Sequence, residues 1–520
     1  MINEVKEGMQ WPPMDLERYK MQEHSAWYSG EAELLANFYF DNDLKNWLNL
    51  NYGTRNSNRF WARQIKNKSS FFIHVPVAND ISETSSTFLF GESPIIRFGS
   101  DSEGMKENQS ELDTMLTESG FFQKLVEAAE VASAIGGVYF KIAWDSEVSE
   151  HPIPVVVQCE QAFPRFKFGK LVSVDLVYEV FNDGSTVYRL VETISKGAIE
   201  NQLYKGSADN LGKKCELSEC DETKELKPTI ETADVMTCFY IPNMLPNKLN
   251  RQSPCGRSDY QGQETLMDAL DETFSAWMID VQIARGKIHV PSGYVKQITE
   301  DGKASFNIDT MMYEELDVDP TAMTKPIEAT QFEIRSQQFE QTCLNLLDRI
   351  ITSSGYSPQS FGLNIAGRAE SGTALNVRER KSYGTTNKKQ AYWEQPIKEI
   401  VAAMCCIKNT YLSGKFNCEL KVNVAFMDSV SNNQAEVATS VKTLADAKAI
   451  STDTKVRMVH PEWTDTQVEE EVERILNDES AGMPMGNPED LTQIEFGKNN
   501  QVTGKGSPDD KQEGLDNIEK

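Results

Sequence analysis

A cluster of carboxylates is the first feature of the sequence that could do chemistry. Glu314, Glu315, Asp317 and Asp319 stand close together in the chain, and oxygen ligands of this kind can hold a divalent cation for nuclease chemistry. Acids at such spacing, without ligands from another segment, are common on solvated loops. A surface loop is therefore the favoured interpretation, and a metal-dependent nuclease is the alternative.

A local excess of basic residues between 368 and 398 is the second such feature. The stretch holds seven Lys or Arg residues against three Glu, a net charge of +4 in a chain whose formal net charge is −27. It could contact an anion, although an exposed helix face with scattered i,i+4 ion pairs would show the same pattern. The basic residues are Arg368, Arg378, Arg380, Lys381, Lys388, Lys389 and Lys398.

The common signatures of catalytic and metal sites are missing from the sequence. No G-x-x-x-x-G-K-[ST], H-E-x-x-H or G-x-S-x-G motif occurs, and no two of the five histidines stand at the spacing of metal ligands. The nine cysteines include no C-x-x-C pair, so reduced thiols in the core are expected. We therefore predict no catalytic residue, no metal and no cofactor.

Length, composition and charge indicate a water-soluble protein with several structural units. The 520 residues are 39% hydrophobic and 25% charged, and such a length suggests about two to four units. No stretch approaches the roughly 18 uncharged apolar residues of a membrane helix, so we expect a cytoplasmic protein without membrane contact. With 52 basic against 79 acidic residues, a broad basic coat for nucleic acid is excluded, but a channel along which a polyanion slides is compatible.

Hydrophobic periodicity predicts helices and a β-rich unit in the first half of the chain. One helix is expected over 76–92, and a second over 108–135, where Gly136-Gly137 closes it. The polar stretch 205–229 predicts an exposed loop or hairpin. Segments rich in β-branched and aromatic residues predict strands at 138–144, 155–157, 171–181 and 187–194.

Two helices with apolar stripes flank a polar insert in the middle of the chain. The longer helix, 260–289, would span roughly 45 Å before Pro291 ends it, and the shorter helix covers 339–350. The insert between them contains Gly, Pro and the acidic cluster. Residues on the long stripe recur at steps of three and four, which predicts packing along one side. They are Leu266, Leu270, Phe274, Trp277, Val281 and Ile288.

The chain becomes irregular after the second striped helix and then helical again. Four glycines and a proline prevent a continuous helix over 354–372. A helix resumes over 373–412, and Pro396 within it must remove one backbone hydrogen bond and bend it. The remaining expectations are a strand at 418–426, helices at about 433–448, 451–459 and 464–478, and a disordered tail over 481–520.

Four stretches of the sequence together resemble the portal proteins of tailed bacteriophages, in particular the siphophage family that forms the head-to-tail connector. Their order and spacing cover about 60–480. They are Ile73–Ile81 continuing to Phe88–Glu92; Leu266–Val290 with Pro291; Gly355–Gly362 with Ser371–Ala374 and Arg378 to Trp393; and Ala449–Thr452 with His460–Thr464.

The resemblance implies an α+β portal fold with a mixed α/β wing, a two-helix stem, a small α/β clip, a kinked long helix and an α-helical crown. The regions would be 1–258 for the first part of the wing, 259–289 and 336–353 for the stem helices, 290–335 for the clip, 354–372 for a tunnel loop, 373–429 for the kinked helix and return strand of the wing, and 430–480 for the crown.

The resemblance also implies a function. The chain would form a dodecameric ring at one capsid vertex of the virion, assembled in the host cytoplasm, through which double-stranded DNA is packaged and ejected without sequence specificity. Its partners would be the terminase large subunit, the head-completion adaptor, and the major capsid and scaffolding proteins. Another virion component, an adaptor or a shell protein, is the alternative, which the helix–insert–helix arrangement disfavours.

Particular residues acquire roles through the same resemblance. The tunnel loop would face the DNA with Leu363, Asn364, Ile365, Ala366, Gly367 and Arg368. Candidate phosphate contacts, which position a duplex without reading its bases, would be Arg378, Arg380, Lys381, Lys388 and Lys389. Pro396 would kink the long helix, and the apolar stripe beginning at Leu266 would pack the stem.

Overall fold

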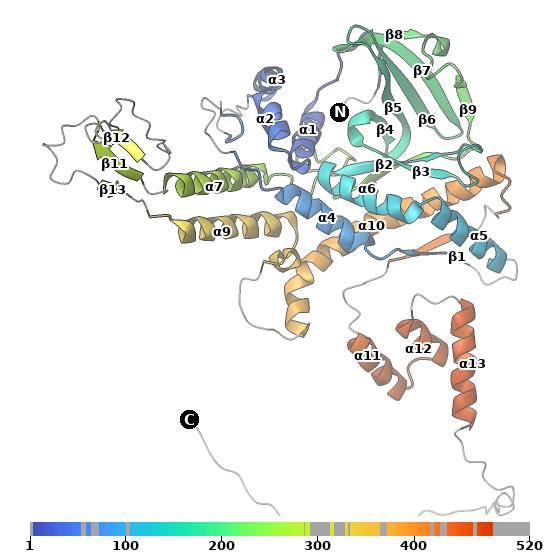
Figure 1. Ribbon diagram of the computed structural model, residues 1–520. Helices are drawn as coiled ribbons and strands as arrows, with labels where there is room; N and C mark the ends of the chain where they lie inside the picture. Colours follow the sequence, from blue (N-terminus) through green and yellow to red (C-terminus); the bar gives the residue numbers. More distant parts are fainter. Residues whose placement is uncertain are drawn as a thin grey trace, which may run out of the picture. The chain divides into compact units, whose positions relative to one another are not determined.

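The protein contains two compact units, Met1–Ser431 and Asn432–Lys520. The computed structural model describes residues 4–53, 59–63, 72–99, 105–284, 287–291, 313–316, 328–330, 333–363, 372–416, 421–426, 434–460 and 465–481. Helices and four β-sheets occur within these residues of the first unit, which confirms the expected α+β class (Figure 1).

A six-stranded sheet forms most of the β-rich unit. Five strands pair in chain order as an antiparallel meander, and a short sixth strand, β9 (Thr229–Glu231), pairs with β7. The strands predicted at 171–181 and 187–194 are present, and the polar stretch from 205 begins in a hairpin. The meander consists of β4 (Ala162–Lys167), β5 (Lys170–Asn182), β6 (Val187–Ser195), β7 (Ala198–Ser207) and β8 (Asn210–Cys215).

A three-stranded antiparallel sheet packs against a buried helix. Its strands are β10 (Cys238–Pro242), β2 (Gly137–Ala143) and β3 (Ile153–Val157) in that order. The single helix expected over 108–135 is wrong in one respect, because two helices occur, α5 (Met105–Glu118) and α6 (Phe121–Ile135). Gly120 separates them with a φ of 67°, a left-handed conformation that glycine adopts readily and that interrupts an α-helix.

A mostly buried helix of the first unit follows three N-terminal helices, of which the first contacts it. This buried helix is α4 (Val77–Phe90), which begins and ends close to the predicted limits of 76–92. It packs against α6 and α10, and its Ser82, Ser85 and Ser86 are buried together with apolar residues. The preceding helices are α1 (Leu16–Tyr28), α2 (Ala32–Phe40) and α3 (Asn42–Tyr52).

The two striped helices lie side by side (Figure 1). They are α7 (Glu264–Ile283) and α9 (Ser336–Ser354), and Trp277 of α7 stacks on Phe339 of α9 with ring centroids 6.2 Å apart. Near the same end, the guanidinium of Arg335 donates to the carboxylate of Asp280 at 2.9 Å. Ring stacking and an ion pair therefore join the two helices where the insert leaves them.

The long helix is shorter than predicted. It ends at Ile283 rather than at 289, because Gly286 and the β-branched Ile288 and Val290 favour an extended chain. Ile288 lies on a strand, and Pro291 ends that strand instead of a helix. The insert forms a three-stranded sheet of β11 (Lys287–Pro291), β12 (Tyr313–Leu316) and β13 (Glu328–Thr330), with β11 in the centre.

The helix that contains Pro396 is the longest of the described elements. It is α10 (Gly372–Tyr411), with 40 residues, and its second half is buried among α4, α5, α6 and β2. The following strand, β14 (Val422–Ala425), is shorter than the predicted 418–426 and pairs antiparallel with β1 (Ile95–Phe98). The chain thus returns to the first unit before the second begins.

The second unit contains three helices in the described residues. They are α11 (Gln434–Asp446), α12 (Thr452–Val459) and α13 (Asp465–Ala481), close to the three predicted ranges. Val456 and Val468 are buried within it. The predicted tail over 481–520 lies beyond the described residues after Ala481. None of the helices in the described ranges is long and apolar enough to cross a membrane.

Candidate functional site

The segment that follows α9 is fixed by a turn that requires glycine. The N–H groups of Gly355 and Tyr356 donate back to the carbonyls of Thr352 (3.3 Å) and Ile351 (3.2 Å), which closes the helix. Gly355 has a φ of 102°, and a Cβ there would lie 2.9 Å from Thr385 Oγ1. A short 3-10 helix, η4 (Pro358–Phe361), then leads to Leu363, where the described part of this segment ends.

The first half of α10 holds this segment by three side-chain contacts. Thr385 Oγ1 donates to the carbonyl of Gly355 at 2.6 Å. Ser382 Oγ accepts from the N–H of Ser357 at 2.9 Å and lies 2.9 Å from Ser360 Oγ. The described half of the predicted tunnel loop is therefore attached to α10 along both the turn and η4.

A buried aspartate, Asp259, connects the same segment to the core. It lies in the connection before α7 and accepts four hydrogen bonds, and we call this group the Asp259 hub. Two of the four donors lie on helices, and the other two lie on connecting segments. The donors are Lys389 Nζ (2.5 Å), Ser133 Oγ (2.6 Å), Asn243 Nδ2 (2.8 Å) and the hydroxyl of Tyr356 (3.0 Å).

The Asp259 hub is an ion pair without access to water. Lys389 is 2% exposed and Asp259 is 4% exposed, and Lys389 Nζ also donates to Ser85 Oγ of α4 at 2.5 Å. Burial acts to raise the pKa of Asp259, but Lys389 and the neighbouring hydrogen bonds outweigh it and hold the pKa below its usual value. Burial lowers the pKa of Lys389, and Asp259 offsets this only in part.

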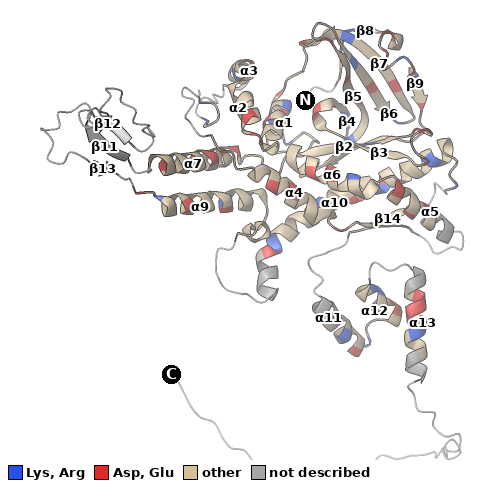
Figure 2. Ribbon diagram, viewed as in Figure 1, with Lys and Arg blue, Asp and Glu red and all other residues tan. Residues whose placement is uncertain are grey.

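This placement contradicts the predicted phosphate contact of Lys389. Its ammonium group is buried and already bonded, so it cannot reach a duplex. Arg380, Lys381 and Lys388 are exposed on α10, although Lys381 Nζ also donates to the carbonyl of Thr352. Figure 2 shows both signs of charge along α10.

The other predicted DNA-facing residues are mostly outside the described part of the chain. Leu363 is half-buried and packs against the core around α7 and α9. Arg378 belongs to α10, but its side chain is not described. Asn364, Ile365, Ala366, Gly367 and Arg368 all lie outside the described residues.

The apolar stripe of α7 is buried or half-buried from Leu266 to Trp277 and exposed at Val281. Leu270 is fully buried, and Leu266, Phe274 and Trp277 are half-buried against the same core. Val281 is 37% exposed, so the far end of α7 presents an apolar side chain to the outside of the single chain.

Two further carboxylates of α7 anchor a segment that sequence analysis did not connect to it. Asp271 accepts from the N–H of Val75 (2.8 Å) and from Trp61 Nε1 (2.9 Å), and it lies 2.8 Å from His74 Nδ1. Asp268 accepts from the N–H of Phe60 at 2.8 Å. Both look like ordinary polar positions in the sequence, because nothing local indicates their distant partners.

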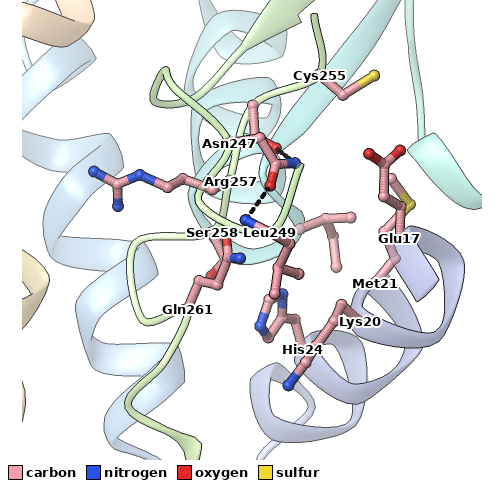
Figure 3. Close-up of a pocket in the computed structure, with 12 residues that line it drawn as sticks. Glu17, Lys20, Met21, His24, Asn247, Leu249, Cys255, Arg257, Ser258 and Gln261 are labelled. Atoms are coloured by element: carbon pink, nitrogen blue, oxygen red, sulfur yellow. Dashed lines mark hydrogen bonds between the residues drawn. The ribbon is translucent and has the colours of Figure 1, made fainter. Parts of the chain in front are cut away.

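A small pocket lies beside α1 (Figure 3). Glu17, Lys20, Met21 and His24 contribute one face of α1 to it, and the connection before α7 contributes the opposite wall. Glu17 Oε2 and His24 Nδ1 are buried without a hydrogen-bond partner among the described residues. The pocket thus combines unpaired polar atoms with apolar side chains such as Met21 and Leu249.

The proposed nuclease site is not assembled in the described residues. Glu314 and Glu315 belong to β12, whereas Asp317 and Asp319 are outside the described part. No group of three or more His, Cys, Asp or Glu side chains in that part is arranged to hold a metal ion. Within the residues that the structure describes, no position for an ion supports the nuclease alternative.

The buried polar contacts described above connect α10 to the segment after α9 and to the connection before α7. The chain belongs to the family of SPP1 Gp6-like phage portal proteins, whose family model matches residues 12–484. This membership confirms the resemblance seen in the sequence and assigns the protein to the virion, at the capsid vertex. The family is a structural family and not an enzyme family.

Three solved structures are similar at low sequence identity. The neck of an empty GTA particle computed with C6 symmetry has 12% identity and a TM-score of 0.42, over 74% of this chain and 90% of that chain. The neck of the native GTA particle computed with C12 symmetry has 10% identity and a TM-score of 0.40, over 74% of this chain and 89% of that chain. The virion of the native gene transfer agent particle has 9% identity and a TM-score of 0.38, over 87% of this chain and 96% of that chain. No curated protein sequence matches, so the assignment rests on the family model.

Proposed function

We propose that this protein forms the dodecameric portal ring of a phage, the channel through which DNA enters the capsid during packaging and leaves it during ejection. The observation that carries the proposal is the family match over residues 12–484. The pair formed by α7 and α9, with a small sheet inserted between them, supports it, because such rods can pack around a common axis.

Most described elements then have a proposed place in the ring. The N-terminal helices and the six-stranded sheet belong to the wing, together with α10 and β14. Helices α7 and α9 form the stem, the sheet of β11 to β13 belongs to the clip, and the unit of α11 to α13 is the crown. The segment after α9 is the base of a tunnel loop that continues through residues 364–371.

DNA contacts in this proposal are electrostatic and independent of sequence. Arg380, Lys381 and Lys388 are exposed on the first half of α10, next to the loop base, where sparse cations can touch phosphates without retaining a sliding duplex. Arg368 and Arg378 keep the same proposed role. The Asp259 hub serves a different purpose, which is to hold the loop base at a fixed place.

The proposed partners follow from the same ring. The clip docks the terminase large subunit during packaging and the head-completion adaptor afterwards, and the wing contacts the major capsid and scaffolding proteins. The chain assembles in the host cytoplasm.

Particle imaging of the purified full-length protein tests the proposal. Electron microscopy of the purified protein should show discrete rings with a central hole. In virions, the ring at the capsid vertex should contain twelve subunits. Monomers alone at high protein concentration would contradict the ring. Closed shells or sheets would instead support a shell protein.

A further inference from the structure

The connection between β10 and α7 is basic, although the whole chain is acidic. Residues 235–258 contain Lys248, Arg251 and Arg257 and no Asp or Glu. The full chain carries 79 acidic against 52 basic residues, and acidic residues are visible on α7 and α13, among other elements (Figure 2). The three cations therefore have no compensating negative charge within the run.

None of these three cations has a partner within the described residues. Arg257 Nε is buried and makes no hydrogen bond there, and Lys248 and Arg251 are exposed. The positive charge of Arg257, together with partial burial, lowers the pKa of Lys248. Two like charges thus lie close together, an arrangement that an added anion would stabilise.

The backbone around Arg257 is fixed by its own contacts. The N–H of Arg257 donates to the carbonyl of Met244, and its carbonyl accepts from Asn243 Nδ2, both at 3.0 Å. A Cβ at Gly256 would lie 2.2 Å from the carbonyl oxygen of Gly136, so the chain passes directly over the end of α6. The backbone that carries the Arg257 side chain is therefore fixed without a bound anion.

Glu17, the acidic residue that lines the pocket beside α1, does not form an ion pair with Arg257. Figure 3 shows the Arg257 side chain extending away from Glu17 and Cys255. Leu249, between the two other cations, is 43% exposed. The surface therefore combines three unpaired cations with an exposed apolar side chain, a composition typical of contact with a protein.

We propose that Lys248, Arg251 and Arg257 form a docking site for a carboxylate-rich surface on a second copy of this chain. A neighbouring copy is favoured because the chain carries a net charge of −27 and so supplies acidic surface next to this basic one. In a ring, each subunit contacts its neighbour through two different surfaces, so one basic and one acidic surface suffice. The inference rests on the proposed ring and adds the surface that joins its subunits.

Photochemical cross-linking in the absence of DNA tests the contact. The full-length protein would carry p-benzoylphenylalanine in place of Leu249, and irradiation of the rings should give covalent dimers. Mass spectrometry should identify the linked peptide as an Asp- or Glu-rich segment of another copy. Rings that form normally but give only links within one chain, or links to a segment without acids, would overturn the inference.

Charge reversal provides an independent measurement. Arg257→Glu and the double variant Lys248→Glu/Arg251→Glu should each raise the protein concentration at which half of the rings dissociate by about tenfold or more. Lys213→Glu, which reverses an exposed cation on β8, should change it by less than about twofold. Lys248→Arg should retain the wild-type value. The double variant covers the case in which Arg257→Glu fails to fold, because both of its positions are exposed.

The outcomes separate this inference from the proposed function. A wild-type protein that never forms rings contradicts the portal proposal itself. Wild-type rings, with equally stable rings from both reversal variants, contradict only the docking site. Equally stable rings that retain less DNA in assembled particles would show that the cations contact DNA, which also overturns docking to a second copy.

Discussion

Lys388 and Lys389 are adjacent residues of the same type with opposite environments. Lys388 is exposed on α10, whereas Lys389 is buried and bonds to Asp259 and Ser85. One step along a helix turns the side chain by about 100°, which is enough to exchange solvent for core. The role of Lys389 is therefore to hold α10 against α4 and the connection before α7.

We predict that Lys389→Met lowers the free energy of unfolding by about 3–5 kcal/mol, because it leaves the Asp259 carboxylate buried without its counter-charge. Lys388→Met should change it by less than about 0.5 kcal/mol. Urea unfolding of the two variants, compared with wild type, measures both values. Equal effects of the two substitutions would contradict the assigned role of Lys389.

Asp259 also makes stability depend on pH. Its pKa is lower in the folded protein than its usual value of 3.8, so the stabilisation is present above that value and is lost as the pH falls through the folded pKa. We predict that Asp259→Asn is less stable than wild type at pH 7 and that the difference narrows below about pH 4. Urea unfolding over pH 2.5–7, about the range concerned, tests this. A constant difference across the range would disagree with it.

The limits of the elements show what periodicity can and cannot predict. Helix α4, the strands β5 and β6 of the meander and the three helices of the second unit follow from local patterns of apolar residues. The end of α7 does not, because its apolar stripe continues in phase to Ile288 while the chain has already changed to a strand. Periodicity also could not predict the Asp259 hub, because its members are spread over the chain between Ser133 and Lys389 and follow no regular spacing.

The turn at Gly355 provides a test at the scale of elements. Gly355→Ala would place a Cβ 2.9 Å from Thr385 Oγ1 on a left-handed backbone, and we expect a loss of about 1–3 kcal/mol. Gly384→Ala, in a helical and exposed position of α10 with no atom within 4 Å of the new Cβ, should gain about 0.5–1 kcal/mol. Thermal unfolding of both variants gives the two signs. A stabilising Gly355→Ala would contradict the described turn.

At the scale of the whole molecule, the excess of acidic residues is compatible with the proposed channel and disfavours a basic coat for nucleic acid. The chain is strongly acidic, and the exposed cations on α10 are few. Composition predicts this general balance but not which cations remain accessible, because accessibility depends on how α10 packs. Family-level stretches predicted the family and the fold class, whereas the neutralised and unpaired cations are visible only in three dimensions.

The proposed DNA path makes a further prediction. Arg380→Glu and Lys388→Glu, in rings of normal size, should reduce the amount of DNA retained in particles, because each replaces an attraction to phosphates by a repulsion. Arg368→Glu should act in the same direction. Quantification of DNA per purified particle is the measurement, with Lys213→Glu as the matched exposed control. Unchanged DNA content in all three variants would remove Arg368 and the first half of α10 from the proposed path.

The attachment of the loop base to α10 has a mechanical consequence. Ser382 and Thr385 grip the segment after α9, and Pro396 lies 14 residues beyond Ser382 on the same helix. At 1.5 Å per residue, Ser382 and Pro396 are separated by about 20 Å along the helix axis. If Pro396 bends α10 as the sequence predicts, a change of about 10° in that bend, with the second half of α10 held in the core, would displace the segment after α9 by roughly 3.5 Å. That stroke is close to the advance of about one base pair along a duplex.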